Sequence, residues 1–252
     1  MLLGIDHLVI AVRDPDSAAS TLERDLGIAF TGGGRHAAWG TFNRLAFFGD
    51  SYLELIGVLD RALAGSATGS AVARASLAVL DGGDEGLATF ALATDDIEGD
   101  VARLRANGSS IGAPVDGSRA RPDGEVVRWR TAVASVGPGE PPFLIEHEDA
   151  GAEWGPDARA ARASFEHPVA GRVRLTRLEV PCADPEALAA AYRSSVGLAF
   201  ETSGDGGPEA RLGPQVVRRS AGPGDEPVVV LSGGWPEPID VIRLGIRWRC
   251  AR

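Results

Sequence analysis

Residues 5–30 read IDHLVIAVRDPDSAASTLERDLGIAF, and this stretch holds the unit that decides the fold. The apolar and β-branched run over residues 5–12 predicts a strand with one face turned to a core. Asp14 is placed to cap a helix whose first residue is Pro15, and Gly27 supplies the left-handed residue that ends it. The stretch therefore predicts a strand followed directly by a helix that covers it.

The same unit occurs three times along the chain. An aspartate and a glycine bracket each helical pattern, and 27 − 14, 108 − 95 and 197 − 184 all give 13. The pairs are Asp14 and Gly27, Asp95 and Gly108, and Asp184 and Gly197. Strand-like runs follow each helix, at 39–48 and 52–58, at 125–134 and 143–147, and at 211–218, 227–231 and 239–248. Because one such unit cannot bury its apolar face alone, the copies are expected to pack beside one another.

Composition excludes several classes of protein. A chain of 252 residues with 44% hydrophobic content is long enough to bury a sizeable core. The formal net charge of −10 argues against nucleic acid as a partner, because phosphate binding needs clustered cations. No run approaches the roughly 18 apolar residues of a membrane span, and no signal peptide is recognisable. With only Cys182 and Cys250, the chain fits a reducing compartment, so a cytoplasmic location is expected.

Catalytic motifs are also excluded by residue type. All 25 cationic residues are arginine, so neither a Schiff-base lysine nor the lysine of a phosphate-binding loop is available. The chain has no Gly-x-Ser-x-Gly nucleophile elbow and no His-Glu-x-x-His zinc motif. Function must therefore come from dispersed side chains that the fold brings together.

Several stretches resemble a known family. Residues 5–12, 40–45 and 52–56 resemble the opening of a glyoxalase-like domain of the vicinal oxygen chelate superfamily, and residues 127–129 and 142–146 resemble its second half. The resemblance covers most of residues 3–170. It implies an α+β fold of repeated βαβββ modules that form open cup-shaped mixed sheets, with helices outside and a small-molecule site in the concavity.

The resemblance and the repeat together predict the domain organisation. The expected division is βαβββ module 1 at 3–58, a linker at 59–85, module 2 at 86–148, a second linker at 149–170, and an additional C-terminal βαβββ-like module at 171–250. Module 2 is expected to pair with module 1. Since paired modules also occur between chains, a homodimer is a further expectation.

Many members of this superfamily hold one divalent ion with a histidine and a glutamate from each of two paired modules. The resemblance assigns His7 and Glu54 to the first module and Glu146 to the second. No second histidine aligns, since Ala88 or Thr89 stands at the matching position. His36 or His147 is available to complete the set. The sequence thus leaves open a site for Zn, Ni, Fe or Mn with an incomplete ligand set, or a pocket without metal.

Other side chains are candidates for the pocket. Glu54 lies between Leu53 and Leu55, so it faces away from them, and a carboxylate among apolar neighbours is a plausible general base. Glu146 is the second candidate base. The candidate substrate-binding residues are His36, Thr41, Asn43, Tyr52, Arg128 and Trp129.

The expected function is that of a small-molecule protein. One hypothesis is a lyase or isomerase that acts next to a carbonyl or enol oxygen, and ring cleavage by a dioxygenase also fits the family. The alternative is a protein that binds or sequesters a small molecule without catalysis or metal, as resistance proteins of the superfamily do. That alternative depends on aromatic walls such as Trp39, Phe42, Tyr52 and Trp129.

Overall fold

The computed structural model describes residues 2–66, 70–135, 137, 140–203, 207–222 and 226–252. The strands are β1 (Leu2–Ala11), β2 (Gly32–His36), β3 (Thr41–Phe48), β4 (Ser51–Val58), β5 (Gly86–Thr94), β6 (Val115–Ala120), β7 (Val126–Ala132), β8 (Phe143–His147), β9 (Arg174–Cys182), β10 (Glu201–Ser203), β11 (Gly207–Leu212), β12 (Gln215–Ala221), β13 (Val228–Ser232), β14 (Ile239–Arg243) and β15 (Ile246–Ala251). The helices are α1 (Pro15–Leu26), α2 (Arg61–Ala64), α3 (Ala71–Asp81), α4 (Ile97–Ala106), α5 (Gly151–Trp154), α6 (Pro156–Ser164) and α7 (Pro185–Val196), with a 3-10 turn η1 (Ala37–Trp39). Among these residues no helix is long and apolar enough to cross a membrane.

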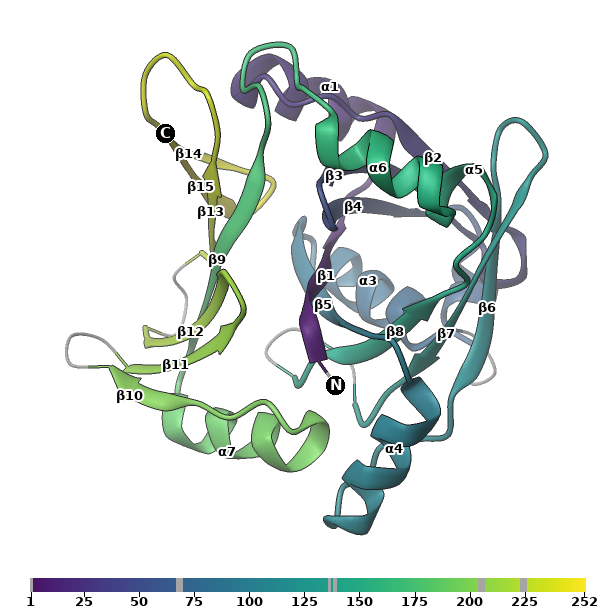
Figure 1. The fold of residues 1–252 in the computed structure, drawn as a ribbon, viewed down its shortest axis with the longest axis vertical. Helices are drawn as coiled ribbons and strands as arrows, with labels where there is room; N and C mark the ends of the chain where they lie inside the picture. Colours follow the sequence, from purple (N-terminus) through teal and green to yellow (C-terminus); the bar gives the residue numbers. More distant parts are fainter. Residues whose placement is uncertain (1, 67–69, 136, 138–139, 204–206, 223–225) are drawn as a thin grey trace.

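The first eight strands form a closed barrel in the order β1-β4-β3-β2-β6-β7-β8-β5 (Figure 1). β1 pairs in parallel with β4, and β5 pairs in parallel with β8, so each module has the same pairing. The two modules join through the antiparallel β1–β5 pair, and a pairing of Arg35 with Ala120 closes the barrel on the other side. The predicted α+β fold of repeated βαβββ modules with cupped sheets is confirmed.

Helix caps explain why the units begin and end where they do. Asp14 and Asp184 accept backbone N–H groups at the starts of α1 and α7. Gly27 and Gly197 end the same helices with φ angles of 67° and 72°, which favour glycine. The second copy is shifted by one residue relative to the prediction, because Asp96 is the N-cap of α4.

Residues 59–85, expected to be a linker, contain α2 and α3. α3 lies on the concave side of the barrel sheet, where Ala75 packs in one cluster with Val9, Ala11 and Ile56. The segment thus supplies part of the wall of the barrel interior.

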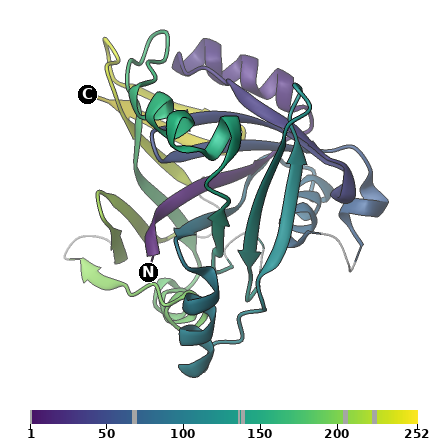
Figure 2. The ribbon, with the colours of Figure 1, turned by 45° about the vertical axis from the view of Figure 1, so that its right-hand side comes forward.

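The remaining strands form a second, open sheet in the order β10-β11-β12-β9-β13-β15-β14. Its pairings repeat those of the barrel: β9 is parallel to β12 and antiparallel to β13, and β13 is parallel to β15. β13 leads to β14 without an intervening helix, so only the first half of this sheet carries one, α7. The second sheet lies to one side of the barrel in both ribbon views (Figures 1 and 2).

The two sheets share one hydrophobic core. Leu178 and Trp248 of the second sheet belong to the same buried cluster as Leu8 and Leu53 of the barrel. Gln215 adds a polar link, since its Oε1 accepts from the backbone N–H of Ile5 at 2.6 Å. The second sheet therefore covers the convex face of the barrel and leaves the concave face to the site.

A β-bulge in β1 sets the direction in which the side chains of Asp6 and His7 point. The register against β5 shifts between Ile5 and His7, so Asp6 is an extra residue in the strand. Ile5 and Leu8 both belong to the outer core. The two residues between them, Asp6 and His7, therefore both turn inward, which simple alternation would not allow.

One buried cation in the second sheet has no polar partner among the described residues. Arg219 is fully buried, and none of its three guanidinium nitrogens makes a hydrogen bond. Its guanidinium lies over the ring of Tyr192, with its Cζ 4.1 Å from the ring centroid. Burial lowers the pKa of Arg219 to about 10. A cation–π contact compensates only part of the desolvation of such a charge.

Replacing Arg219 by methionine should therefore stabilise the protein. Arg219→Met keeps most of the buried volume and removes the charge, and a relief of about 1 kcal/mol raises the melting temperature by about 2–4 °C in a chain of this size. Thermal unfolding followed by circular dichroism measures the change. Arg249→Met is the control, because Arg249 is exposed and lies 3.5 Å from Asp240. The control should melt at about the temperature of the wild type. A melting temperature of Arg219→Met at or below that of the wild type would contradict the expectation.

Candidate functional site

The barrel contains a cavity of about 360 Å³, a size that suits a small molecule. Its aromatic walls are Trp39, Tyr52, Trp129, Phe143 and Trp154. Its polar and charged lining includes His7, His36, Thr41, Asn43, Glu54, Arg74, Asp116, Arg119, His147 and Glu153. The pocket thus combines aromatic and aliphatic walls with a set of polar side chains.

His7 is the first of these groups. It is buried, and its Nδ1 lies 2.6 Å from Oδ1 of Asp6. An ionised carboxylate only accepts hydrogen bonds, so Nδ1 carries the proton and donates it. The opposite nitrogen, Nε2, lies 3.6 Å from Oε2 of Glu54. The ring of Tyr52 stacks on His7 with centroids 4.5 Å apart, which further fixes the plane of the imidazole.

Glu54 is oriented from its other oxygen. Nδ2 of Asn43, on the neighbouring strand β3, donates to Oε1 of Glu54 at 2.6 Å. Glu54 is buried, so this bond and the nearby imidazole of His7 favour one arrangement of the carboxylate. Oε2 is therefore the oxygen that faces His7.

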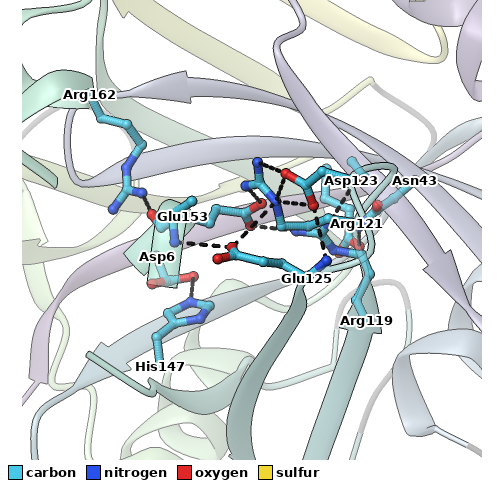
Figure 3. A network of polar contacts seen from close by, with 12 residues as sticks. Asp6, Asn43, Arg119, Arg121, Asp123, Glu125, His147, Glu153 and Arg162 are labelled. Atoms are coloured by element: carbon cyan, nitrogen blue, oxygen red, sulfur yellow. Dashed lines mark hydrogen bonds and ion pairs between the residues drawn. The ribbon is translucent and has the colours of Figure 1, made fainter. Parts of the chain in front are cut away.

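Asp6 holds a second imidazole as well as His7. Nε2 of His147, at the end of β8, lies 3.1 Å from the same Oδ1 of Asp6 (Figure 3). Burial acts to raise the pKa of Asp6, but the charges and hydrogen bonds of the two histidines together outweigh it. The pKa of Asp6 is thus held well below its ordinary value. The His147 ring in turn stacks on Trp154, with centroids 3.5 Å apart.

His36 is a buried, neutral member of the cavity wall. Its Nδ1 lies 3.0 Å from Oγ1 of Thr41, and its ring lies 5.5 Å from that of Trp39 between centroids. Burial lowers the pKa of His36 to about 4, with Glu54 opposing the shift and Arg119 adding to it. At neutral pH His36 therefore contributes no charge to the pocket.

A short helical segment, α5 and α6, lies across one end of the barrel (Figure 1). Its Glu153 accepts hydrogen bonds from Nη2 of Arg119 and, at 3.1 Å, from Nη1 of Arg121 (Figure 3). The other terminal nitrogen of Arg119 donates to the carbonyl oxygen of Gly33. Arg162 of α6 lies over the ring of Trp154. The segment is thus fixed to the barrel by ion pairs and ring contacts.

The structure brings most of the predicted site residues to this cavity. His7, His36, Thr41, Asn43, Tyr52, Glu54 and Trp129 all line it.

Arg128 and Glu146 do not line this cavity, so the prediction that they belong to the pocket is corrected. Side chains alternate along β7 and β8, so Trp129 and His147 face inward while their neighbours Arg128 and Glu146 face outward. Glu146 instead forms an ion pair with Arg130 on the outside of the barrel.

Several residues of the site were not predicted as such. Asp6 was missed because a bulge cannot be read from alternation. Arg119 and Glu153 were missed because nothing in the sequence pairs them, and Glu153 and Trp154 lie in the expected linker at 149–170. The sequence indicates His147 only as an extra metal ligand, although its two-residue spacing from Ile145 is a usable signal for the inward face.

The donors that converge here do not fit the divalent metal site of the superfamily. His7 and Glu54 offer two donors, and the residue opposite His7 on β5 is Ala91. Glu146 would have to leave Arg130 and cross the sheet to join them. The described residues contain no group of three or more histidine, cysteine, aspartate or glutamate side chains that could hold an ion. A resident metal in a protein ordinarily has three or four such ligands.

A comparison with models of protein families shows which family the chain belongs to. The model described as "Glyoxalase-like domain" matches residues 5–196. The chain belongs to the glyoxalase-like domain family. The resemblance inferred from the sequence is therefore confirmed.

One solved structure shares the fold over nearly the whole chain, and others match about half of it. A hypothetical protein from Staphylococcus aureus is 17% identical, with a TM-score of 0.80, and the match covers 98% of this chain and 99% of that one. Methylmalonyl-CoA epimerase from Mycobacterium tuberculosis is 20% identical, with a TM-score of 0.43 over 57% of this chain and 88% of that one. A Streptomyces coelicolor methylmalonyl-CoA epimerase variant in complex with 2-nitronate-propionyl-CoA is 21% identical, with a TM-score of 0.43 over 57% and 97%. No curated protein matches the chain.

The neutral state of His36 makes the stability of this glyoxalase-like protein depend on pH. An unfolded histidine gains its proton near 6.5, whereas folded His36 resists protonation to about 4. Since the unfolded state then binds more protons, stability is lost as pH falls from 6.5 to 4, by about 3 kcal/mol. Denaturant unfolding of the wild type and of His36→Gln measures this loss. The stability of the wild type minus that of the variant should be constant above pH 6.5 and fall below it. A difference that stays constant down to pH 4 would contradict the assignment.

Proposed function

We propose that this protein is an enzyme of the isomerase or lyase type that removes a proton next to a carbonyl group, with Glu54 as the base. The observation that carries the proposal is the orientation of Glu54 by Asn43 on one oxygen and by His7 near the other. A buried, oriented carboxylate beside an imidazole in a small-molecule cavity is an arrangement suited to general base catalysis.

In the proposed step, Glu54 accepts the proton through Oε2. The C–H bond next to the carbonyl breaks, its electron pair forms the carbon–carbon double bond of an enolate, and negative charge develops on the carbonyl oxygen. Donation from Nε2 of His7 to that oxygen requires the imidazolium form of the ring, in which Nδ1 donates to Asp6 at the same time. Return of the proton to a different face or atom gives isomerisation, and loss of a leaving group gives lyase chemistry.

Proton exchange tests the proposal without knowledge of the natural substrate. A panel of neutral ketones with exchangeable C–H bonds, including benzylacetone, is incubated with the protein in deuterated water, and deuterium uptake is followed by NMR. The wild type should accelerate uptake for at least one member. Glu54→Gln should lower that rate by about 10²–10⁴, the usual contribution of a general base.

Glu146→Gln is the matched control, since Glu146 is an ion-paired glutamate on the outside of the barrel. It should exchange deuterium at the wild-type rate. Equal rates in the wild type and Glu54→Gln would remove Glu54 from the role of base.

The alternative function, binding without catalysis, is favoured by a different observation. Five aromatic residues line the cavity, and such walls hold flat apolar ligands well. A ketone that binds to the wild type without any deuterium uptake would support this alternative. A homodimer and a cytoplasmic location stay predictions, and sedimentation of the purified protein tests the first.

A further inference from the structure

Fixed charges in the cavity favour some ligands over others. Three carboxylates, Glu54, Asp116 and Glu153, line it, against two guanidinium groups, those of Arg74 and Arg119. His36 adds no charge because burial lowers its pKa to about 4. Asp116 is exposed, whereas Glu54 and Glu153 are buried. A further buried carboxylate, that of Asp6, lies behind His7 and His147. The buried carboxylates Glu54, Glu153 and Asp6 each lie beside an imidazole or a guanidinium. A ligand carboxylate therefore needs a cation that is not already paired.

Arg119 is the cation placed to receive such a group, and its terminal nitrogens are already engaged. It is 3% exposed, one nitrogen donates to the carbonyl oxygen of Gly33, and another donates to Glu153. Glu153 is 5% exposed and also holds Arg121 at 3.1 Å. The second guanidinium, that of Arg74, lies at the exposed N-terminal end of α3, where it donates to the carbonyl oxygen of Ser66 at 3.2 Å. An anion deep in the cavity would therefore compete with Glu153 for this guanidinium.

We propose that the cavity selects neutral ligands with an apolar or aromatic body, and that Glu153 sets this selectivity by neutralising Arg119. The inference rests on the proposed function in placing the substrate in the same cavity, and it names the class of that substrate: an uncharged carbonyl compound. An anion such as a carboxylate or a phosphate ester is excluded. Glu153 is thus a specificity-determining residue that reaches the cavity from α5, outside the barrel strands.

A pair of probes of matched shape tests the selectivity. Benzylacetone and hydrocinnamate share the same phenylethyl body, and one ends in a methyl ketone where the other ends in a carboxylate. Isothermal titration calorimetry measures both affinities at neutral pH. The wild type should bind benzylacetone at least about tenfold more tightly, which corresponds to about 1.4 kcal/mol. Equal or tighter binding of hydrocinnamate, or no binding of benzylacetone, would overturn the proposal.

Two single substitutions should move the preference in opposite directions. Glu153→Gln leaves the guanidinium of Arg119 without its carboxylate, so hydrocinnamate should bind about tenfold more tightly than to the wild type. Arg119→Gln removes the cation while Glu153 keeps Arg121, so the preference for benzylacetone should grow. A merely structural role of the pair would weaken both probes in both variants, and that result would contradict the assignment.

Melting temperatures separate an effect on ligand selectivity from a general loss of stability. Because Glu153→Gln leaves a buried charge without its partner, its melting temperature is measured with and without hydrocinnamate. The carboxylate should raise the melting temperature of this variant more than that of the wild type, since a ligand stabilises the state that binds it. An equal rise in the variant and the wild type would contradict the proposal. Glu146→Gln, an ion-paired glutamate away from the cavity, should leave the ratio of the two affinities unchanged.

This test is separable from that of the proposed function. Selective binding of the neutral probe needs no proton transfer, so it can hold even if Glu54 proves not to be a base. Conversely, deuterium uptake into anionic substrates would support the base and refute the selectivity.

Discussion

The site depends on one carboxylate that serves two imidazoles. Oδ1 of Asp6 accepts from Nδ1 of His7 at 2.6 Å and from Nε2 of His147 at 3.1 Å, and all three side chains are shielded from water. The β-bulge makes this possible, because it turns Asp6 and His7 to the same side of β1. Because Nδ1 of His7 is bound to Asp6, its Nε2 faces Glu54. The contact of Asp6 with His147 also links β1 of the first module to β8 of the second.

Much of the fold can be predicted from the sequence because characteristic residues mark where its helices begin and end. Asp14, Gly27, Asp184 and Gly197 act through local backbone geometry, so caps and turns can be read directly from residue type. The inward direction of Glu54 likewise follows from alternation along β4. The offset between Glu146 and His147 could not be fixed, since a shift of one residue reverses every side chain of a strand and the sequence does not reveal register. Contacts between distant segments, such as Arg119 with Glu153, leave no sequence signal at all.

The second sheet shows that repetition of a fold does not repeat a site. Its strand pairings and its bulge in β9 match those of the barrel. By register, Arg177 stands where His7 stands in the barrel, and Arg218 stands where Glu54 stands. The sheet uses its apolar face to cover the barrel, and two arginines stand in place of the imidazole and the carboxylate of the barrel site. The repeat predicts architecture, while the chemistry depends on the residues at a few inward positions.

The most direct test of this account is the protonation of Asp6. Carboxyl-carbon NMR of the protein labelled at its aspartates, with Asp6 assigned through Asp6→Asn, follows that group as pH is lowered to about 3. The two imidazole partners predict that the Asp6 carboxyl stays ionised throughout, because its pKa lies well below the ordinary 3.8. A transition at or above that ordinary value would contradict the shared carboxylate on which the arrangement of His7, His147 and Glu54 depends.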